Sequence, residues 1–318
     1  MKQFKSFQAK QAGFTLLELL VVITLLAILS VGALVAYEGV GDNAQATAAA
    51  NNTASADRAI RNFRAVTQNY PDQWDSLVTT TGVAPAFLAA TTQAAFANLA
   101  LPVSAAAGDF RDVLDARVEG VGIGALQARV IAAATPNVEP NLQHNEGALG
   151  AAAATDVVEE DFDAIANFSI LPSYNAGDAT AVPVIAAAAC SVGGVPLPAT
   201  KLDGTTAIGV ADGQRQNAIN DGLESSQCNF VLALGFGHDA AHSTNNSSVA
   251  ISTAPTYLSK DINPATSYAR YVALFHVGAD TDGDNNIVVG ELFAKPRLLA
   301  VVDTEGKAID QSIAASNP

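Results

Sequence analysis

The residues best suited to chemistry lie near the C-terminus, in the stretch Asp280–Glu291 with the sequence DTDGDNNIVVGE. Acids occupy its first, third and fifth positions, and Glu291 is its twelfth residue. This spacing is that of an EF-hand loop, in which oxygen ligands at alternating positions curl around one calcium ion. Asn285 stands at the sixth position, where glycine is usual, and asparagine tolerates the left-handed conformation better than most residues. We therefore predict a Ca²⁺ site with the ligands Asp280, Asp282, Asp284, Asn286 and Glu291.

The alternative for this loop is an acidic, solvated hairpin turn that holds no ion. The flanking segments have the pattern of strands rather than helices, so the loop would stand outside an EF-hand fold. Three or four carboxylates this close together repel one another unless a cation lies among them. We expect the calcium to be structural rather than catalytic, holding the last strands together.

Glu18 is the second residue that points to function, because it is the one formal charge in the apolar run Phe14–Tyr37. That run has 24 residues, enough to span a bilayer, and the basic flank before it predicts a cytoplasmic N-terminus. An acid inside a membrane segment is costly and needs a partner. A cut after Gly13 would leave the helix in place and create an α-amino group at Phe14, which could neutralise Glu18 of a neighbouring subunit. Such a head-to-tail contact does not close and generates helical filaments.

The stretch Lys10–Leu20, KQAGFTLLELL, resembles the signal of type IV prepilins and type II secretion pseudopilins. The resemblance covers roughly the first 40 residues. It implies that a prepilin peptidase cuts between Gly13 and Phe14 and methylates the new amine, and that Glu18 docks subunits. The membrane helix lacks the proline common in the family, and nearby glycines are interpreted as replacing it. The alternative is a signal-anchor helix with a tolerated acid.

Two pairs of residues remain as weaker candidates. Cys190 and Cys228 form no C-x-x-C motif; outside the cytoplasm they would make a disulfide, and otherwise they are two small unpaired hydrophobic residues. His238 and His242 stand four residues apart, a spacing that binds metal only on a helix. Glycines before them and a Ser/Asn run after them indicate a loop, so we expect no metal site there.

Enzymes and nucleic-acid-binding proteins are disfavoured. The chain contains no G-x-S-x-G, Walker A or dinucleotide motif, and no spacing argues for a catalytic triad, so we predict that it is not an enzyme. The formal net charge is −15, although Lys2, Lys5 and Lys10 stand in the first thirteen residues without an acid. So acidic a surface repels phosphate backbones, and no nucleic-acid partner is expected.

The elements that must position these residues begin with a long helix. Its second half, Asp42–Asn69, is alanine-rich and free of proline, and Pro71 ends it. Four residues share one face at helical spacing, and one exposed ion pair is expected at i, i+4. These residues are Ala56, Ile60, Phe63 and Thr67 on the face, and Asp57 with Arg61 in the pair.

Beyond the long helix, Asp72 is expected to cap a short helix. Residues 83–135 have a mostly helical pattern, best in Asp109–Ala134 with a break at its glycines, and 136–228 is a loop-rich elaboration. Three short apolar runs bounded by turn residues predict strands that form a small antiparallel sheet. These runs are Asn229–Gly235, Ser267–Gly278 and Arg297–Asp303.

Together these features predict an α+β protein with a long N-terminal helical spine and a globular head. The expected organisation is a leader at 1–13, a spine helix at 14–70 with a transmembrane part at 14–37, and a head at 71–318 that includes the loop 280–291.

The predicted function is that of a structural subunit, which polymerises with its own copies into a type IV pilus-like filament or a type II secretion pseudopilus. Its expected partners are prepilin peptidase, the inner membrane before assembly, and other minor pilins. Its final place is an extracellular pilus or fimbrium, or a periplasmic pseudopilus. The alternative is a minor or tip pilin whose large head acts in cell adhesion or binds substrate.

Overall fold

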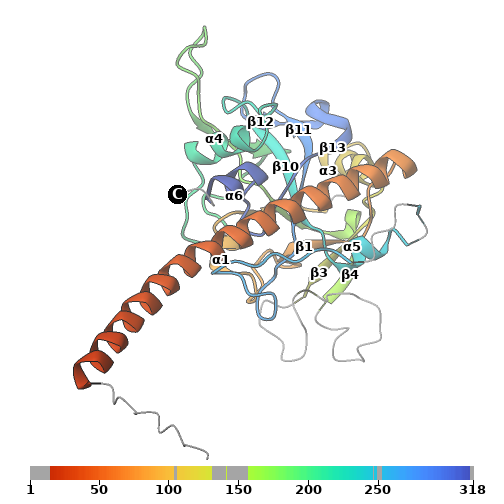
Figure 1. Cartoon of the computed structure of the whole chain (residues 1–318). Helices are drawn as coiled ribbons and strands as arrows, with labels where there is room; N and C mark the ends of the chain where they lie inside the picture. The colour runs from red at the N-terminus through yellow and green to blue at the C-terminus, as the bar shows by residue number, and fades with distance from the viewer. Residues whose placement is uncertain are drawn as a thin grey trace, which may run out of the picture. The chain divides into compact units, whose positions relative to one another are not determined.

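The computed structural model describes residues 15–103, 106–130, 141, 157–245, 247–248 and 253–315. It confirms the α+β class (Figure 1). The helices are α1 (Leu16–Thr67), α2 (Ala90–Gln93), α3 (Phe110–Glu119), α4 (Val210–Ile219), α5 (His238–His242) and α6 (Ile309–Ala315), with the 3₁₀ turns η1 (Phe162–Ala164) and η2 (Val289–Glu291). The strands are β1 (Trp74–Thr79), β2 (Ala97–Ala100), β3 (Ala125–Arg129), β4 (Val157–Asp161), β5 (Asn167–Ile170), β6 (Tyr174–Asn175), β7 (Ala188–Ala189), β8 (Ser191–Val192), β9 (Val195–Pro196), β10 (Asn229–Gly235), β11 (Val272–Ala279), β12 (Asn286–Ile287) and β13 (Leu292–Val302).

The chain divides into two compact units, Met1–Gln45 and Ala46–Pro318. The described part of the first unit is the N-terminal portion of α1, where Leu16–Val35 is long and apolar enough to cross a membrane, with a mean hydropathy of 2.6. None of this segment is buried against the rest of the chain. Unburied apolar side chains in such number require a lipid or protein environment.

Within the second unit, the C-terminal portion of α1 packs on the sheet through the predicted face. Ala56, Ile60 and Phe63 are buried, whereas Thr67 is exposed. The helix ends at Thr67, three residues before the predicted end, because Gln68 adopts a left-handed conformation with φ 64°.

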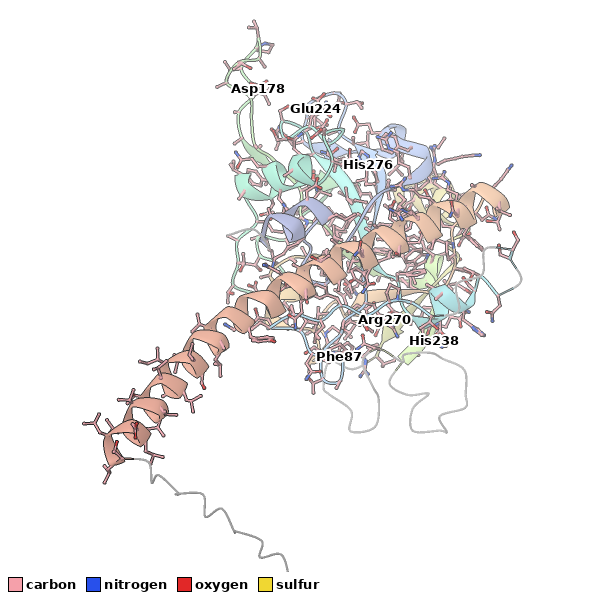
Figure 2. The ribbon with its side chains drawn as sticks, viewed as in Figure 1. Phe87, Asp178, Glu224, His238, Arg270 and His276 are labelled. Carbon is pink, nitrogen blue, oxygen red and sulfur yellow. A yellow bond between two sulfur atoms is a disulfide. The ribbon has the colours of Figure 1, made fainter. Side chains whose placement is uncertain are left out.

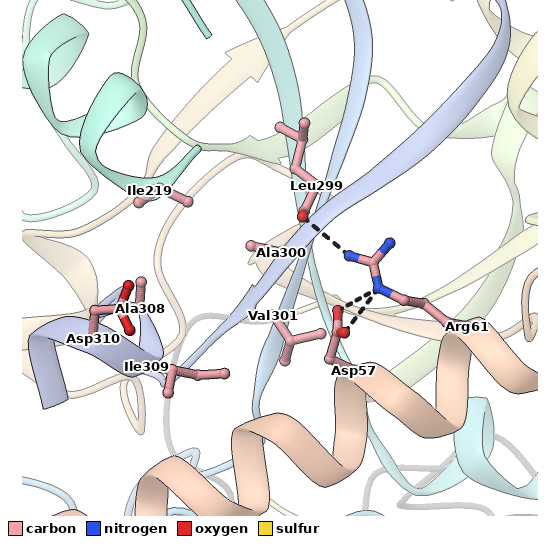
Figure 3. Close-up of a pocket in the computed structure, with 9 residues that line it drawn as sticks. All are labelled: Asp57, Arg61, Ile219, Leu299, Ala300, Val301, Ala308, Ile309 and Asp310. Carbon is pink, nitrogen blue, oxygen red and sulfur yellow. Dashed lines mark hydrogen bonds and ion pairs between the residues drawn. The ribbon is translucent and has the colours of Figure 1, made fainter. Parts of the chain in front are cut away.

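Polar contacts fix the same part of α1 to the edge strand β13. Arg61 pairs with Asp57 at 2.8 Å, as predicted, and its Nη2 donates to the carbonyl of Leu299 at 3.1 Å (Figure 3). The Tyr70 hydroxyl, just after the helix, accepts the N–H of Leu298 at 2.8 Å. Next to the contact between Arg61 and Leu299, residues of α1, β13 and the start of α6 line a hollow of about 250 Å³.

Within the described residues the main sheet has eight strands, so it is larger than the three strand signals indicate. Its continuous order is β13-β11-β10-β1-β3-β4, and β5 pairs with both β10 and β2. β10 has the predicted bounds, whereas β11 begins at Val272 and β13 at Leu292. The sheet is mixed, because β1 and β3 run parallel while the other pairs are antiparallel.

The core explains why β10 and β11 are mostly apolar. All side chains of both strands are buried, because separate hydrophobic clusters cover the two faces of the sheet. On one face, the Trp74 ring lies 5.3 Å from Phe236 and 5.2 Å from Phe275 between ring centres. Aromatic pairs at such distances add stability beyond the area that they bury.

Three local predictions are wrong. Residues 83–109, expected to be mostly helical, hold only α2 and the strand β2 in their described part. Asp72 caps no helix; its carboxylate accepts the N–H groups of Gly124 and Ala125 at 2.8 and 2.9 Å, and the chain continues into β1. The helical stretch that begins at Asp109 stops at Glu119, and β3 follows. Gly122 has φ 97°, a conformation that no helix accommodates, and the strand then pairs with β1.

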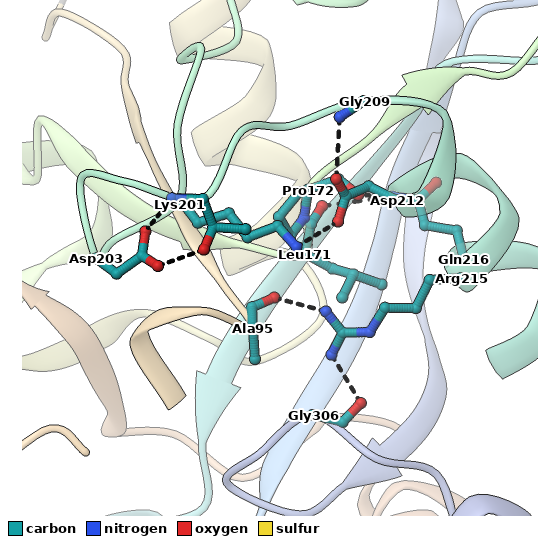
Figure 4. A network of polar contacts seen from close by, with 11 residues as sticks. Ala95, Leu171, Pro172, Lys201, Asp203, Gly209, Asp212, Arg215, Gln216 and Gly306 are labelled. Atoms are coloured by element: carbon teal, nitrogen blue, oxygen red, sulfur yellow. Dashed lines mark hydrogen bonds and ion pairs between the residues drawn. The ribbon is translucent and has the colours of Figure 1, made fainter. Parts of the chain in front are cut away.

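One buried ion pair and two charge-assisted hydrogen bonds attach α4 to neighbouring loops (Figure 4). Lys201 pairs with Asp212 at 2.7 Å with both side chains largely buried. Arg215 donates to the carbonyls of Ala95 and Gly306, 2.8 Å each. The loop-rich elaboration is therefore bound to the core, at least where it is described.

One part of the elaboration projects instead. The strands β6 and β7 begin a narrow ribbon that projects from the rest of the second unit, with Asp178 partway along it (Figures 1 and 2). Its tip is apolar: Val182 is 98% exposed and Val184 68%. Apolar side chains that stand this close together are seldom exposed to water on a protein surface.

Candidate metal centre and N-terminal signal

The acidic loop 280–291 connects β11 to β13, two neighbouring strands of the main sheet. Asp280 follows β11 directly and is buried, whereas Asp282 and Asp284 are exposed. One carboxylate oxygen from each of the three lies within 4.8 Å of the others. Calcium–oxygen bonds are about 2.3–2.6 Å, so ligands on opposite sides of one ion are about 5 Å apart. The three acids thus stand at a separation that one calcium ion would bridge.

Backbone N–H groups curl the loop around its own carboxylates. Asp280 accepts the N–H of Gly283 at 2.8 Å and of Asn285 at 2.9 Å. Asp282 and Asp284 each accept the N–H two residues further on, at 3.1 and 2.7 Å. Asn285 takes the left-handed conformation with φ 66°, which is the one that the usual glycine provides.

Glu291 closes the loop from the other side. Its Oε1 accepts the hydroxyl of Thr281 at 2.8 Å and the N–H of the same residue, and its Oε2 accepts the N–H of Val288 at 3.1 Å. The carboxylate thus lies across the loop, where a twelfth-position ligand belongs. It already has protein donors, which an arriving ion would displace or share.

Asn286 is the predicted ligand whose side chain the structure directs elsewhere. Its Oδ1 accepts the hydroxyl of Ser191 at 3.0 Å and the N–H of Gly194 at 2.9 Å, so it anchors the β8–β9 turn. The seventh position of an EF-hand loop ligates through the backbone carbonyl. Asn286 therefore fits the ligand set only through its main chain.

The electrostatics of the loop favour a cation. The N–H of Asp284 lowers the pKa of Asp282, but desolvation and the charges of Asp284, Glu291 and Asp280 together hold it above its ordinary value. For Glu291 burial raises the pKa, yet the donors from Thr281, Val288 and Asp282 outweigh this and lower it. Glu291 thus favours its charged form, which adds a carboxylate to an already repulsive cluster.

A disulfide lies next to the acidic loop and is connected to it by a backbone hydrogen bond. Cys190 and Cys228 are bonded at an S–S distance of 2.01 Å with Cα atoms 5.6 Å apart. The carbonyl of Cys228 accepts the N–H of Asp280 at 2.9 Å, and Cys190 precedes β8, which pairs with β12 inside the loop. The crosslink therefore joins the starts of β8 and β10, the strands that pair with β12 and β11 on either side of the first three acids. All-oxygen donors on so braced a loop suit a hard, structural cation rather than a catalytic metal.

At the N-terminus, Glu18 caps its own helix. Its Oε2 accepts the N–H and the hydroxyl of Thr15, both at 3.0 Å, while the N–H of Glu18 donates to the Thr15 hydroxyl at 3.2 Å. This reciprocal pair is a capping box. The predicted cleavage residues Gly13 and Phe14 lie outside the described residues.

One comparison with known proteins bears on this region. Residues 8–34 match the family described as the prokaryotic N-terminal methylation motif. The chain carries the type IV pilin and pseudopilin signal. The pilin signal supports a pilin-like or pseudopilin subunit, processing by prepilin peptidase, and membrane anchoring before assembly. No curated protein and no solved structure matches the chain.

The structure departs from the sequence-based expectation at the two histidines. His238 and His242 lie on the helix α5, not in a loop, and their rings stand 5.8 Å apart between centres at an interplanar angle of 15°. The preceding glycines are needed for packing: a Cβ at Gly237 would collide with the Asp75 carboxylate, and one at Gly235 with the Tyr268 hydroxyl. Glycine therefore signalled close packing here rather than a loop.

Proposed function

We propose that the protein is a structural subunit of a type IV pilus-like filament or a type II secretion pseudopilus. The observation that carries the proposal is the methylation motif at residues 8–34, which overlaps an apolar helix with no burial in its own chain. Prepilin peptidase cuts between Gly13 and Phe14, and the subunit waits in the inner membrane. Copies of the helix then bury one another's apolar side chains in an extracellular pilus or a periplasmic pseudopilus.

Glu18 has a specific task in this scheme. In a staggered stack of helices, its carboxylate pairs with the α-amino group of Phe14 on a neighbouring subunit. The Thr15 donors found in the single chain hold the Glu18 carboxylate in place until that amine arrives. An ion pair away from water is far stronger than one at a protein surface, so its removal strongly affects assembly.

The test separates docking from helix capping. Glu18→Ala is expected to abolish filaments in sheared preparations, because the partner amine is left unpaired. Glu38→Ala, which removes the next acid along the same helix, is the matched control and is expected to leave filaments abundant. Thr15→Val removes the cap but keeps the acid. If Thr15→Val abolishes filaments as Glu18→Ala does, Glu18 acts only as a cap and the docking role is wrong.

Calcium completes the head in this proposal. The ion binds Asp280, Asp282, Asp284, the backbone of Asn286 and Glu291, and joins β11 to β13 next to the disulfide. The supporting observation is the separation of the three acids on a loop whose backbone already follows the EF-hand path. Its function is to keep the head folded outside the cytoplasm, where calcium is abundant enough to fill a weak site.

A second candidate function is that of a minor or tip subunit whose head binds a surface or a substrate. The projecting β6–β7 ribbon favours it, because an apolar tip of Val182 and Val184 suits a contact with another molecule. Abundance distinguishes the two. A major subunit dominates sheared filaments, whereas a tip subunit is scarce in them.

A further inference from the structure

The pair His238 and His242 has no part in the proposed function, yet its spacing on a helix is that of a chelating pair. Both side chains stand on α5 four residues apart, so they share one face of the helix. His238 is 36% exposed and lies near the surface of the second unit (Figure 2), and His242 is exposed. Solvent and dissolved ions therefore reach both rings.

The distance between the rings fits one shared ion. A zinc–nitrogen bond is about 2.0–2.1 Å and the ring centre lies roughly 1 Å beyond the nitrogen, so rings sharing an ion have centres about 5–6 Å apart. The observed separation is 5.8 Å, with nearly parallel rings. The rings are stacked, and imidazole lone pairs lie in the ring plane, so each ring must turn about its side-chain bonds before both nitrogens point at one ion.

A buried carboxylate orients the first ring. Asp239 Oδ1 lies 3.2 Å from His238 Nδ1, and the Asp239 side chain is only 8% exposed. The carboxylate accepts the Nδ1 proton, so in the neutral ring Nε2 is the nitrogen that carries the lone pair. Carboxylate–histidine–metal arrangements of this kind recur in metalloproteins, where the outer carboxylate fixes the ring and raises its basicity.

The His242 ring contacts Asn245, and a bound metal ion would have to displace that contact. The side-chain amide of Asn245 lies 2.8 Å from His242 Nδ1 and 2.9 Å from Nε2. An ion must replace this neutral contact, which costs less than breaking a charged one. Two protein nitrogens leave the remaining coordination positions open, so the site exchanges its ion readily, unlike a closed four-ligand structural site.

The donor type selects the ion. Imidazole nitrogen suits late first-row transition metals, whereas calcium requires oxygen ligands, so this pair and the acidic loop would not compete for one ion. Affinity for a given nitrogen site is highest for Cu²⁺ in the divalent series. We propose that His238 and His242 form a second, imidazole-based site that binds one divalent transition-metal ion, Cu²⁺ most tightly, with Asp239 as the positioning residue.

The experiment titrates Cu²⁺ into the full chain in detergent, with saturating Ca²⁺ to occupy the acidic loop. Calorimetry is expected to give one equivalent, and electron paramagnetic resonance to show coupling to two nitrogens. His238→Gln and His242→Gln are each expected to lose the two-nitrogen signal. Asp239→Asn is expected to weaken Cu²⁺ binding by about 10-fold while keeping that signal, because the ring is no longer held.

A spacing control shows whether the geometry matters. The double change His242→Ala with Ser243→His keeps the number of histidines but places the second ring on another face of the helix. It is expected to lose the two-nitrogen signal while its circular dichroism spectrum and melting temperature match those of the wild type. Stoichiometric binding that persists in this control, or in the double variant His238→Gln/His242→Gln, would overturn the proposal. So would a wild-type chain that binds no Cu²⁺.

Discussion

The sharpest stability prediction concerns Asp75, a fully buried acid in the central strand β1. Burial raises the pKa of its carboxyl from 3.8 to about 7, although the Tyr268 hydroxyl donates to Oδ2 at 2.6 Å and favours the charged form. The other oxygen, Oδ1, has no hydrogen-bond partner among the residues that the structure describes. Ionised Asp75 therefore costs stability that protonated Asp75 does not.

The sign and size of the effect follow from linkage. Between pH 3.8 and about 7 the folded chain holds a proton on Asp75 that the unfolded chain has lost. Stability is therefore full below pH 3.8 and falls as the pH rises to about 7. One pKa unit is worth about 1.4 kcal/mol, so the shift amounts to about 4 kcal/mol across this window.

The perturbation is Asp75→Asn, which keeps an oxygen that can accept from Tyr268 but carries no charge. The assay is urea unfolding from pH 3.5 to 7.5, followed by the fluorescence of Trp74, the single tryptophan, which is buried beside Asp75. The two chains are expected to be about equally stable at pH 3.5. At pH 7.5 the variant is expected to be more stable by about 4 kcal/mol.

Comparing variant with wild type cancels the other titrating groups. Burial raises the pKa of Asp303 to about 6, which also lowers stability as the pH rises, and lowers that of His276 to about 4, which lowers stability as the pH falls below 6.5. Both contributions are common to the two chains. A stability difference that does not change with pH, or a variant less stable at pH 7.5, would refute the reasoning.

Three further predictions concern the head. Calcium removal with EGTA is expected to lower the melting temperature of the wild type, measured by differential scanning calorimetry, but not that of Glu291→Gln. An equal drop in both proteins would exclude Glu291 as a ligand. The Cys190–Cys228 disulfide closes a loop with a sequence separation of 38. Its reduction is expected to lower the free energy of unfolding, measured in urea, by about 4 kcal/mol. An unchanged urea midpoint would show that the crosslink is dispensable. Gly122 has φ 97°, and a Cβ added there would lie 2.6 Å from Asn69, so Gly122→Ala is expected to lower the free energy of unfolding by about 1–3 kcal/mol. Gly194→Ala is the control, because a Cβ there meets open space. Equal losses of stability in both variants would contradict the packing argument.

The parts of the structure that sequence predicts well depend on neighbouring residues. The strand β10 is a continuous apolar run between Asn229 and Gly235, and both of its faces are buried. The buried face of α1 follows from helical spacing. The acids of the candidate calcium loop also come from one short stretch, so their convergence around a coiled loop was predictable from spacing alone.

The parts that were not predicted depend on residues far apart in the chain. The parallel pairing of β1 with β3 is invisible in either strand, and it turns the stretch after Asp72 from a helix into a strand. The glycines before α5 have the pattern of a loop, yet their role is to admit Asp75 and Tyr268. Only the folded sheet brings those side chains against them.

The most direct test of the account is the intact mass and N-terminal sequence of the protein sheared from cells. The account predicts a mature chain that begins at methylated Phe14 and is recovered in fibres or, for a pseudopilus, in membrane-associated assemblies. A chain that still begins at Met1 and stays in the membrane as a single copy would contradict it, and would leave a membrane-anchored head with a candidate calcium loop.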